Sequence, residues 1–164
     1  MNSVVAAVAL ATAITVQADG LDTSFKSYED YKFITDTRSK QYELQQNAWT
    51  DRNGLRRYGA LSDYMVAVGT PYGKVGDRIE ITLDSGESFI AIVGDSKGDR
   101  HYHSCGRGAC VVEFIVDTPN LDTTTKQMGD ISYLDEKFEG DVVSITPLPS
   151  YDELQEKYSL QCWS

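Results

Sequence analysis

The sequence DRIEITLDSGESFIAIV, residues 77–93, holds two strand patterns joined by a turn. In residues 77–83, polar and apolar residues alternate, which places three apolar side chains on one face of a β-strand. The Asp-Ser-Gly sequence at 84–86 is typical of a tight hairpin turn. Residues 88–93 are mostly apolar and form the second pattern. This stretch therefore predicts a β-hairpin.

Further short strand patterns lie on both sides of the hairpin, at residues 64–68, 111–116 and 142–145. Turns rich in glycine and aspartate separate them. Short strands separated by such turns favour a small closed or nearly closed β barrel of about six strands. We therefore expect a mainly β fold, with only short helices at its periphery.

The regions outside these strands predict an arm and two short helices. Ser39 is placed to cap a helix over residues 40–49, and Ser150 and Glu153 have capping-box spacing before a helix over residues 151–158. Aromatic residues before the first helix are expected to fasten the arm to the outside of the barrel. The expected parts are an apolar N-terminal segment, the arm and the barrel domain, at residues 1–20, 21–53 and 54–164.

Composition and charge limit the classes of partner. The 164 residues are 41% hydrophobic, which is enough for one globular domain, and they carry a formal net charge of −10. That charge argues against nucleic-acid binding and against docking on anionic lipid. It fits a polysaccharide, a small molecule or a protein partner. Walker A and GxGxxG patterns are absent from the sequence, so we expect no cofactor.

The N-terminal segment predicts export. Residues 4–16 form an uncharged run of thirteen, rich in alanine and valine, whose length suits a signal peptide and is too short to span a bilayer. Val16 and Ala18 place small residues where a signal peptidase cuts. We therefore expect a secreted or cell-envelope protein, with no membrane span in the mature chain. The alternative is an apolar helix that belongs to an assembly, such as a virion tail.

Two acidic residues are candidates for chemistry. Glu113 lies inside the apolar pattern of residues 111–116, and a desolvated carboxyl there would keep a proton near neutral pH. A protonated carboxyl is the general acid that glycosidic bond cleavage requires. Asp95 ends a strand pattern and opens a glycine-containing loop, a common place for a functional group. The structural alternatives are an edge-strand glutamate facing water and an Asx turn at the aspartate.

A cluster of histidine and cysteine residues follows Asp95. His101, His103, Cys105 and Cys110 are all residue types that bind zinc, but their spacing is not that of a standard zinc site. We therefore predict no metal site here. In an exported protein, a disulfide that uses Cys105 is the favoured interpretation, with Cys110 or Cys162 as its partner.

Residues 25–145 resemble a known family. The sequence GDSKG at 94–98 and the sequence VEF at 112–114 resemble two acidic motifs of the 3D domain, found in exported or phage-associated proteins of Gram-positive bacteria. That domain is a double-psi β barrel, similar to the catalytic barrel of MltA-type lytic transglycosylases. The resemblance implies that Glu113 corresponds to their proton donor. Residues 68–70, where the family has another aspartate, hold no acid.

Two functions from different classes follow from these patterns. The first is a peptidoglycan-cleaving enzyme of the lytic transglycosylase type, in which Glu113 donates the proton and Asp95 orients it or stabilises the sugar cation. The second is a non-catalytic module that binds a cell wall or forms part of a phage tail tip or surface assembly with protein partners. Catalysis requires Asp95 and Glu113 to line one groove. Candidates for binding the polysaccharide are Tyr64, Tyr72, Tyr102 and Lys97.

Overall fold

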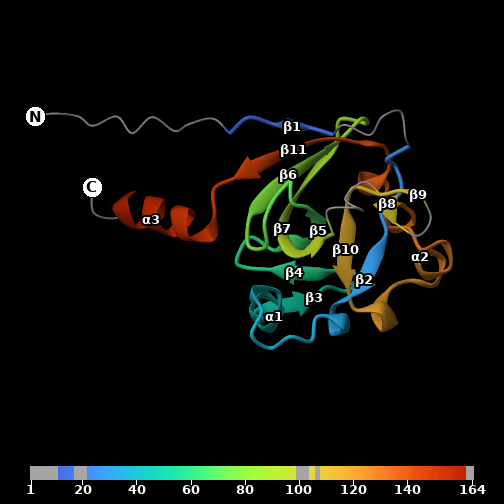
Figure 1. The fold of residues 1–164 in the computed structure, drawn as a ribbon, viewed down its shortest axis with the longest axis horizontal. Helices are drawn as coiled ribbons and strands as arrows, with labels where there is room; N and C mark the ends of the chain where they lie inside the picture. The colour runs from blue at the N-terminus through green and yellow to red at the C-terminus, as the bar shows by residue number, and fades with distance from the viewer. Residues whose placement is uncertain (1–10, 17–21, 99–103, 106–107, 162–164) are drawn as a thin grey trace, which may run out of the picture.

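The computed structural model of the chain describes residues 11–16, 22–98, 104–105 and 108–161. Within these residues, nine strands form one mixed sheet, with the order β1-β11-β6-β7-β5-β10-β2 and with β4 pairing with β5 and β3 with β4 (Figure 1). The strands of this sheet are β1 (Ile14–Thr15), β2 (Tyr28–Asp30), β3 (Ala48–Thr50), β4 (Arg56–Tyr58), β5 (Asp63–Gly69), β6 (Arg78–Leu83), β7 (Ser88–Lys97), β10 (Glu113–Val116) and β11 (Val142–Leu148). A separate ribbon consists of β8 (Ser104–Cys105) and β9 (Gly108–Ala109).

Short helices connect or flank the strands. The three α-helices of the described residues are α1 (Lys40–Gln46), α2 (Thr123–Met128) and α3 (Tyr151–Gln161). The 3₁₀ helices are η1 (Tyr31–Phe33), η2 (Thr118–Asn120), η3 (Ile131–Tyr133) and η4 (Glu136–Phe138). Together with the sheet, these helices make the fold mixed α/β rather than mainly β.

The predicted hairpin is confirmed. Strands β6 and β7 pair antiparallel, and Gly86 adopts a φ of 87° in the turn between them. The alternation also holds, because Ile79, Ile81 and Leu83 are all buried in the main core. Strand β7 continues beyond the predicted end of its pattern, since its last residues pair in parallel with β5.

The predicted barrel is wrong, because the sheet is open. Closure would require the strands at the two sides of the sheet to pair with each other. Instead, the outer edge of β11 pairs with β1, with Ile14 opposite Ile145, and the outer edge of β10 pairs with β2, with Phe114 opposite Tyr28. In the part of the chain that the structure describes, no pairing joins β1 to β2. The double-psi barrel implied by the family resemblance is therefore not formed.

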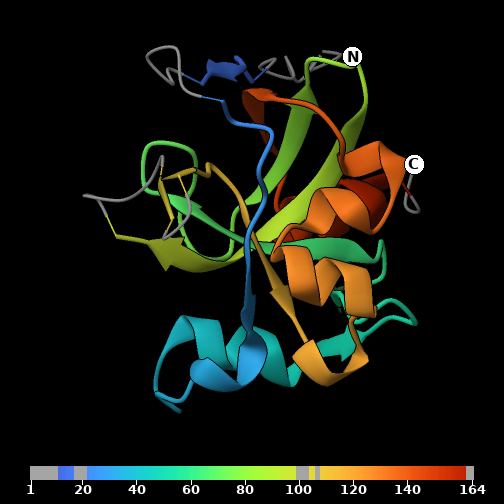
Figure 2. The same ribbon diagram turned by 90° about the vertical axis from the view of Figure 1, so that its right-hand side faces the viewer.

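The arm also differs from its prediction, because it contributes to the sheet instead of packing outside a barrel. Strand β2 pairs in parallel with β10, and the two lie side by side in both views (Figures 1 and 2). Strand β3 pairs with β4, which connects the rest of the arm to β5. Residues before the expected barrel domain therefore form part of the same sheet.

The sheet buries apolar side chains on both faces. The main core contains the aromatic rings of Phe89, Phe114 and Phe138, whose centroids lie 5.0 to 5.5 Å apart. A smaller core on the other face contains Leu44, Met65, Ile92 and Ile115. Because Leu44 belongs to α1, this helix covers the second face. That face is the one that carries the candidate site.

Both predicted helix starts are confirmed. The Ser39 hydroxyl accepts a hydrogen bond from the backbone N–H of Tyr42, although α1 ends at Gln46, three residues before the predicted end. Ser150 and Glu153 exchange side-chain and backbone hydrogen bonds at the start of α3, as a capping box does. Helix α3 projects beyond the body of the sheet (Figure 1).

Candidate functional site

Strand register brings the two predicted acids to one face of the sheet. Ala67 on β5 lies opposite Glu113 on β10 and also opposite Asp95 on β7. Side chains that are paired directly across strands point to the same face. Ala67 follows Val66 of the main core, so it and its two partners lie on the side of the smaller core. Both acids therefore lie on the same face of the sheet.

A bulge in β7 produces this register. Val66 pairs with Val93, but Ala67 pairs with Asp95, so Gly94 is an extra residue in β7. A Cβ atom on Gly94 would lie 2.7 Å from Cδ1 of Ile115 and 2.9 Å from Cε of Met65. Only glycine fits this close approach without displacing the smaller core. The bulge turns Asp95 towards the same face as Glu113.

A third carboxyl group, Glu29, joins the first two. It lies on β2 opposite Ile115, which is two residues beyond Glu113 on β10 and therefore on the same face. Glu29 interacts electrostatically with both Asp95 and Glu113. We call Glu29, Asp95 and Glu113 the carboxyl cluster.

Glu29 is the member of the cluster that holds a proton near neutral pH. Burial is the main cause that raises the pKa of Glu29 to about 7, followed by the negative charges of the other two acids. The Lys97 ammonium acts in the opposite direction. Among the described residues, the buried Oε1 atom of Glu29 has no hydrogen-bond partner, so ionisation there is not compensated. A carboxyl group with these properties suits general acid catalysis at neutral pH.

Glu113 has different surroundings, which include an ammonium group and a hydroxyl group. Lys97 Nζ lies 3.4 Å from its Oε2 atom, and Ser27 Oγ donates a hydrogen bond of 2.6 Å to its Oε1 atom. The Lys97 side chain is 2% exposed and that of Glu113 is 25% exposed. The glutamate is therefore accessible, while its cationic partner is buried beneath it.

Asp95 and Cys110 complete the site. Asp95 Oδ1 accepts a hydrogen bond of 2.7 Å from the backbone N–H of Ser96 and one of 3.4 Å from Gln41 on α1. The buried Cys110 thiol lies 3.1 Å from Ser27 Oγ and 3.6 Å from Lys97 Nζ, and it donates to the carbonyl of Val112. Because Cys110 is a thiol, it does not serve as the disulfide partner predicted for Cys105.

The remaining predicted residues do not join the cluster. Tyr72 is 4% exposed in the main core, and Tyr64 packs against Phe89, Phe114 and Phe138 on that same side. These tyrosines pack in the core and do not face the carboxyl cluster. Lys97, another predicted binding residue, does contact the cluster, through Glu113. Tyr102, His101, His103 and Cys162, and the side chain of Cys105, lie outside the described residues. Within the described residues, no group of three His, Cys, Asp or Glu side chains is arranged to hold a metal ion.

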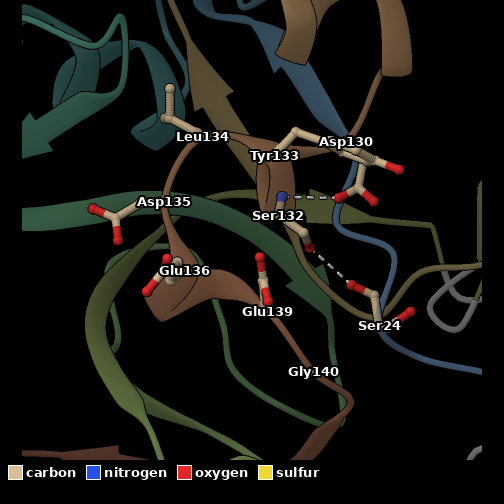
Figure 3. A pocket seen from close by; sticks show the side chains of 9 residues that line it. All are labelled: Ser24, Asp130, Ser132, Tyr133, Leu134, Asp135, Glu136, Glu139 and Gly140. Atoms are coloured by element: carbon tan, nitrogen blue, oxygen red, sulfur yellow. Dashed lines mark hydrogen bonds between the residues drawn. The ribbon is translucent and has the colours of Figure 1, made fainter.

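A larger pocket lies elsewhere and is structural in character. It has a volume of about 550 Å³ and is lined by acidic residues and serines around η3 and η4 (Figure 3). Asp130 Oδ1 accepts hydrogen bonds from the backbone N–H groups of Ser132 and Lys26, and Asp135 Oδ1 accepts one from Lys137. These acids cap 3₁₀ helices, and the pocket includes no member of the carboxyl cluster.

Sequence reasoning missed Glu29, although the sequence contains a signal for it. Ser27 and Glu29 alternate with Lys26 and Tyr28, so a strand there places the serine and the glutamate on one face. The sequence does not show that this strand pairs with β10, which is what brings Glu29 to the other acids. An acid surrounded by aromatic residues in the arm was the available hint.

Comparisons with protein-family models, with curated proteins and with solved structures give no match to this chain. The family resemblance inferred from residues 94–98 and 112–114 therefore has no support beyond the sequence itself. None of the helices in the described residues has the length and apolar character needed to cross a membrane. A proposal for the function must therefore start from the geometry of the carboxyl cluster.

Proposed function

We propose that this protein cleaves a glycan by general acid–base catalysis, with Glu29 as the proton donor. One observation carries the proposal: a partly buried carboxyl group with a pKa of about 7 lies among two other acids and a buried lysine. Near neutral pH such a site supplies a proton from Glu29 beside two further carboxyl groups. Cleavage of a glycosidic bond uses this combination of groups.

The proposed reaction needs few groups. Glu29 gives its proton to the glycosidic oxygen as the bond from that oxygen to the anomeric carbon breaks. Asp95 and Glu113 stabilise the positive charge that develops on the sugar ring. A hydroxyl of the same sugar, or a water molecule, then attacks the anomeric carbon and passes its proton to Glu29. This last transfer restores the acid.

The proposal changes the role that the sequence suggests for Glu113. Glu113 contacts Lys97 and Ser27, whereas burial raises the pKa of Glu29. We therefore assign the proton transfer to Glu29 and the stabilisation of the sugar cation to Glu113. Asp95 keeps its expected role beside the acid.

Peptidoglycan is the glycan that we propose as substrate. Its support is the resemblance of residues 94–98 and 112–114 to motifs of exported proteins that act on cell walls. This resemblance favours a location at a cell surface or in a virion that meets one. The non-catalytic module remains the competing proposal, and an activity assay separates the two.

The test is incubation of the protein with purified peptidoglycan, followed by mass spectrometry for anhydro-muropeptides and for hydrolysed muropeptides. Glu29→Gln should reduce product formation by about 10²–10⁴-fold, because it removes the transferable proton but keeps the shape of the side chain. Glu87→Gln, in the exposed β6–β7 turn, is the matched control and should keep full activity. Absence of both product types from the wild-type protein would contradict the enzyme and favour the binding module.

A further inference from the structure

A second, smaller pocket opens directly beside the carboxyl cluster. It has a volume of about 290 Å³ and is lined by residues 33–36, Ser39, Gln41 and Asp95. This size is just below the range of about 300–1,000 Å³ that ligand pockets cover, and it suits a single sugar ring rather than a larger ligand. Asp95 belongs both to the pocket and to the cluster, so a ligand in the pocket lies next to the proposed acid.

The pocket combines polar groups that are open to a ligand. Within the described residues, the Thr35 hydroxyl and Gln41 Oε1 make no hydrogen bond, although Gln41 Nε2 donates to Asp95. Asp36 Oδ1 accepts from the backbone N–H of Arg38 and lies 3.6 Å from Arg38 Nε, while Oδ2 has no hydrogen-bond donor among the described residues. The pocket therefore offers a neutral hydroxyl, an amide oxygen and carboxylate oxygens to hydrogen-bond donors.

Phe33 supplies an apolar wall to this polar pocket. Its side chain is 77% exposed at the end of η1, more than any other large hydrophobic residue described. A sugar ring has the matching chemistry, since its C–H face packs on an aromatic ring while its hydroxyl groups hydrogen-bond at the rim. Two carboxylates in the lining, Asp36 and Asp95, disfavour phosphates and other anions.

We propose that this pocket binds one pyranose ring of the glycan, with Phe33 stacked on the ring and Gln41 and Asp36 bound to its hydroxyls. This inference rests on the proposed glycan-cleaving function. A ring in this position brings the neighbouring glycosidic bond towards Asp95 and the rest of the cluster. The residues that line this pocket would therefore determine which sugars the protein binds.

The experiment measures binding separately from cleavage. The protein carries Glu29→Gln so that the ligand is not cut, and chitotetraose, a β-1,4-linked N-acetylglucosamine oligomer, is titrated into it by calorimetry. We expect Phe33→Ala to weaken binding by about tenfold, the equivalent of one lost aromatic contact. Phe33→Trp should retain the affinity, and Gln41→Leu should reduce it without touching the aromatic wall.

The matched control is Tyr158→Ala, which removes an aromatic ring that is 64% exposed on α3, away from the pocket. It should leave binding unchanged. Thermal melting of each variant shows that the fold is intact, which the high exposure of Phe33 favours. An equal loss in the Phe33 and Tyr158 variants, no loss in either pocket variant, or no binding at all would overturn the inference.

The two proposals fail in different ways. If the wild-type protein does not cleave peptidoglycan, but Glu29→Gln binds chitotetraose through Phe33, the binding pocket is supported and the proposed enzymatic function is contradicted. If cleavage occurs and depends on Glu29, but Phe33→Ala and Gln41→Leu bind and cleave normally, the enzymatic function is supported and the proposed binding pocket is contradicted.

Discussion

Asp95 and Glu113 occupy the same register position on the two strands that flank β5. Ala67 lies between them and is paired with both. The residue between the two acids carries only a methyl group and is itself buried. Four predictions follow from this arrangement and from the packing around it.

The first prediction concerns pH and Glu29. The pKa of its carboxyl rises from 4.5, the ordinary value, to about 7 in the folded protein. Between these two pH values the folded state holds a proton that the unfolded state has released. Stability therefore falls as pH rises through this window and then levels off above pH 7. Urea unfolding of wild-type protein at several pH values, with Glu29→Gln as reference, measures the difference.

Glu29→Gln should remove this fall, because the amide does not titrate. At pH 8 the variant should be at least as stable as the wild-type protein, since an uncompensated buried charge is absent. Equal pH dependence of the two proteins would show that Glu29 has an ordinary pKa and would remove the basis for its role as proton donor.

The second prediction concerns the effect of Glu113→Gln on stability. In the structure, this change leaves the buried Lys97 ammonium without its anionic partner. Loss of a hydrogen-bonded charged partner costs about 1.5–3 kcal/mol, so the free energy of unfolding should fall by that amount. The double variant Glu113→Gln, Lys97→Met should recover part of the loss. Failure to recover any of it would contradict the coupling of the two side chains.

The third prediction tests the bulge at Gly94. Gly94→Ala places a methyl group against Ile115 and Met65 and should destabilise the protein by about 1–3 kcal/mol through overpacking. Gly98→Ala is the control, because a Cβ atom there meets no atom within 4 Å. Thermal melting of the two variants compares them directly. Similar melting temperatures would mean that the β7 backbone is not held against the smaller core.

The fourth prediction concerns the buried ion pair of Asp63 and Arg78, whose side chains are 3% and 5% exposed. Arg78 Nε lies 2.6 Å from Asp63 Oδ2, and Tyr151 of α3 donates to the same oxygen. Asp63→Asn leaves a buried guanidinium without its counter-ion and should cost about 3–5 kcal/mol in urea unfolding.

Glu43→Gln provides the comparison for this pair. It breaks the exposed ion pair of Lys40 and Glu43, whose nitrogen and oxygen are 3.1 Å apart, and should cost less than about 0.5 kcal/mol. A cost for Asp63→Asn as small as that of the exposed pair would contradict the structural role of Arg78.

The sequence by itself determined the local structure. Alternation in residues 77–83 identified a strand face that is buried, and the Asp-Ser-Gly turn identified the hairpin. Ser39 and the pair Ser150 and Glu153 identified two helix starts. These features depend on neighbours a few residues apart, through side-chain period and capping bonds, so a short stretch of sequence contains the information that they need.

Only the tertiary structure decided which strands pair and what the carboxyl groups do. The pairing of β2 with β10 and of β1 with β11 keeps the sheet open, and neither pairing is encoded in a local pattern. The same pairing brings Glu29 to Asp95 and Glu113. A pKa depends on burial and on charges that distant segments supply, so the sequence could propose an acid in this cluster but not determine which one keeps its proton.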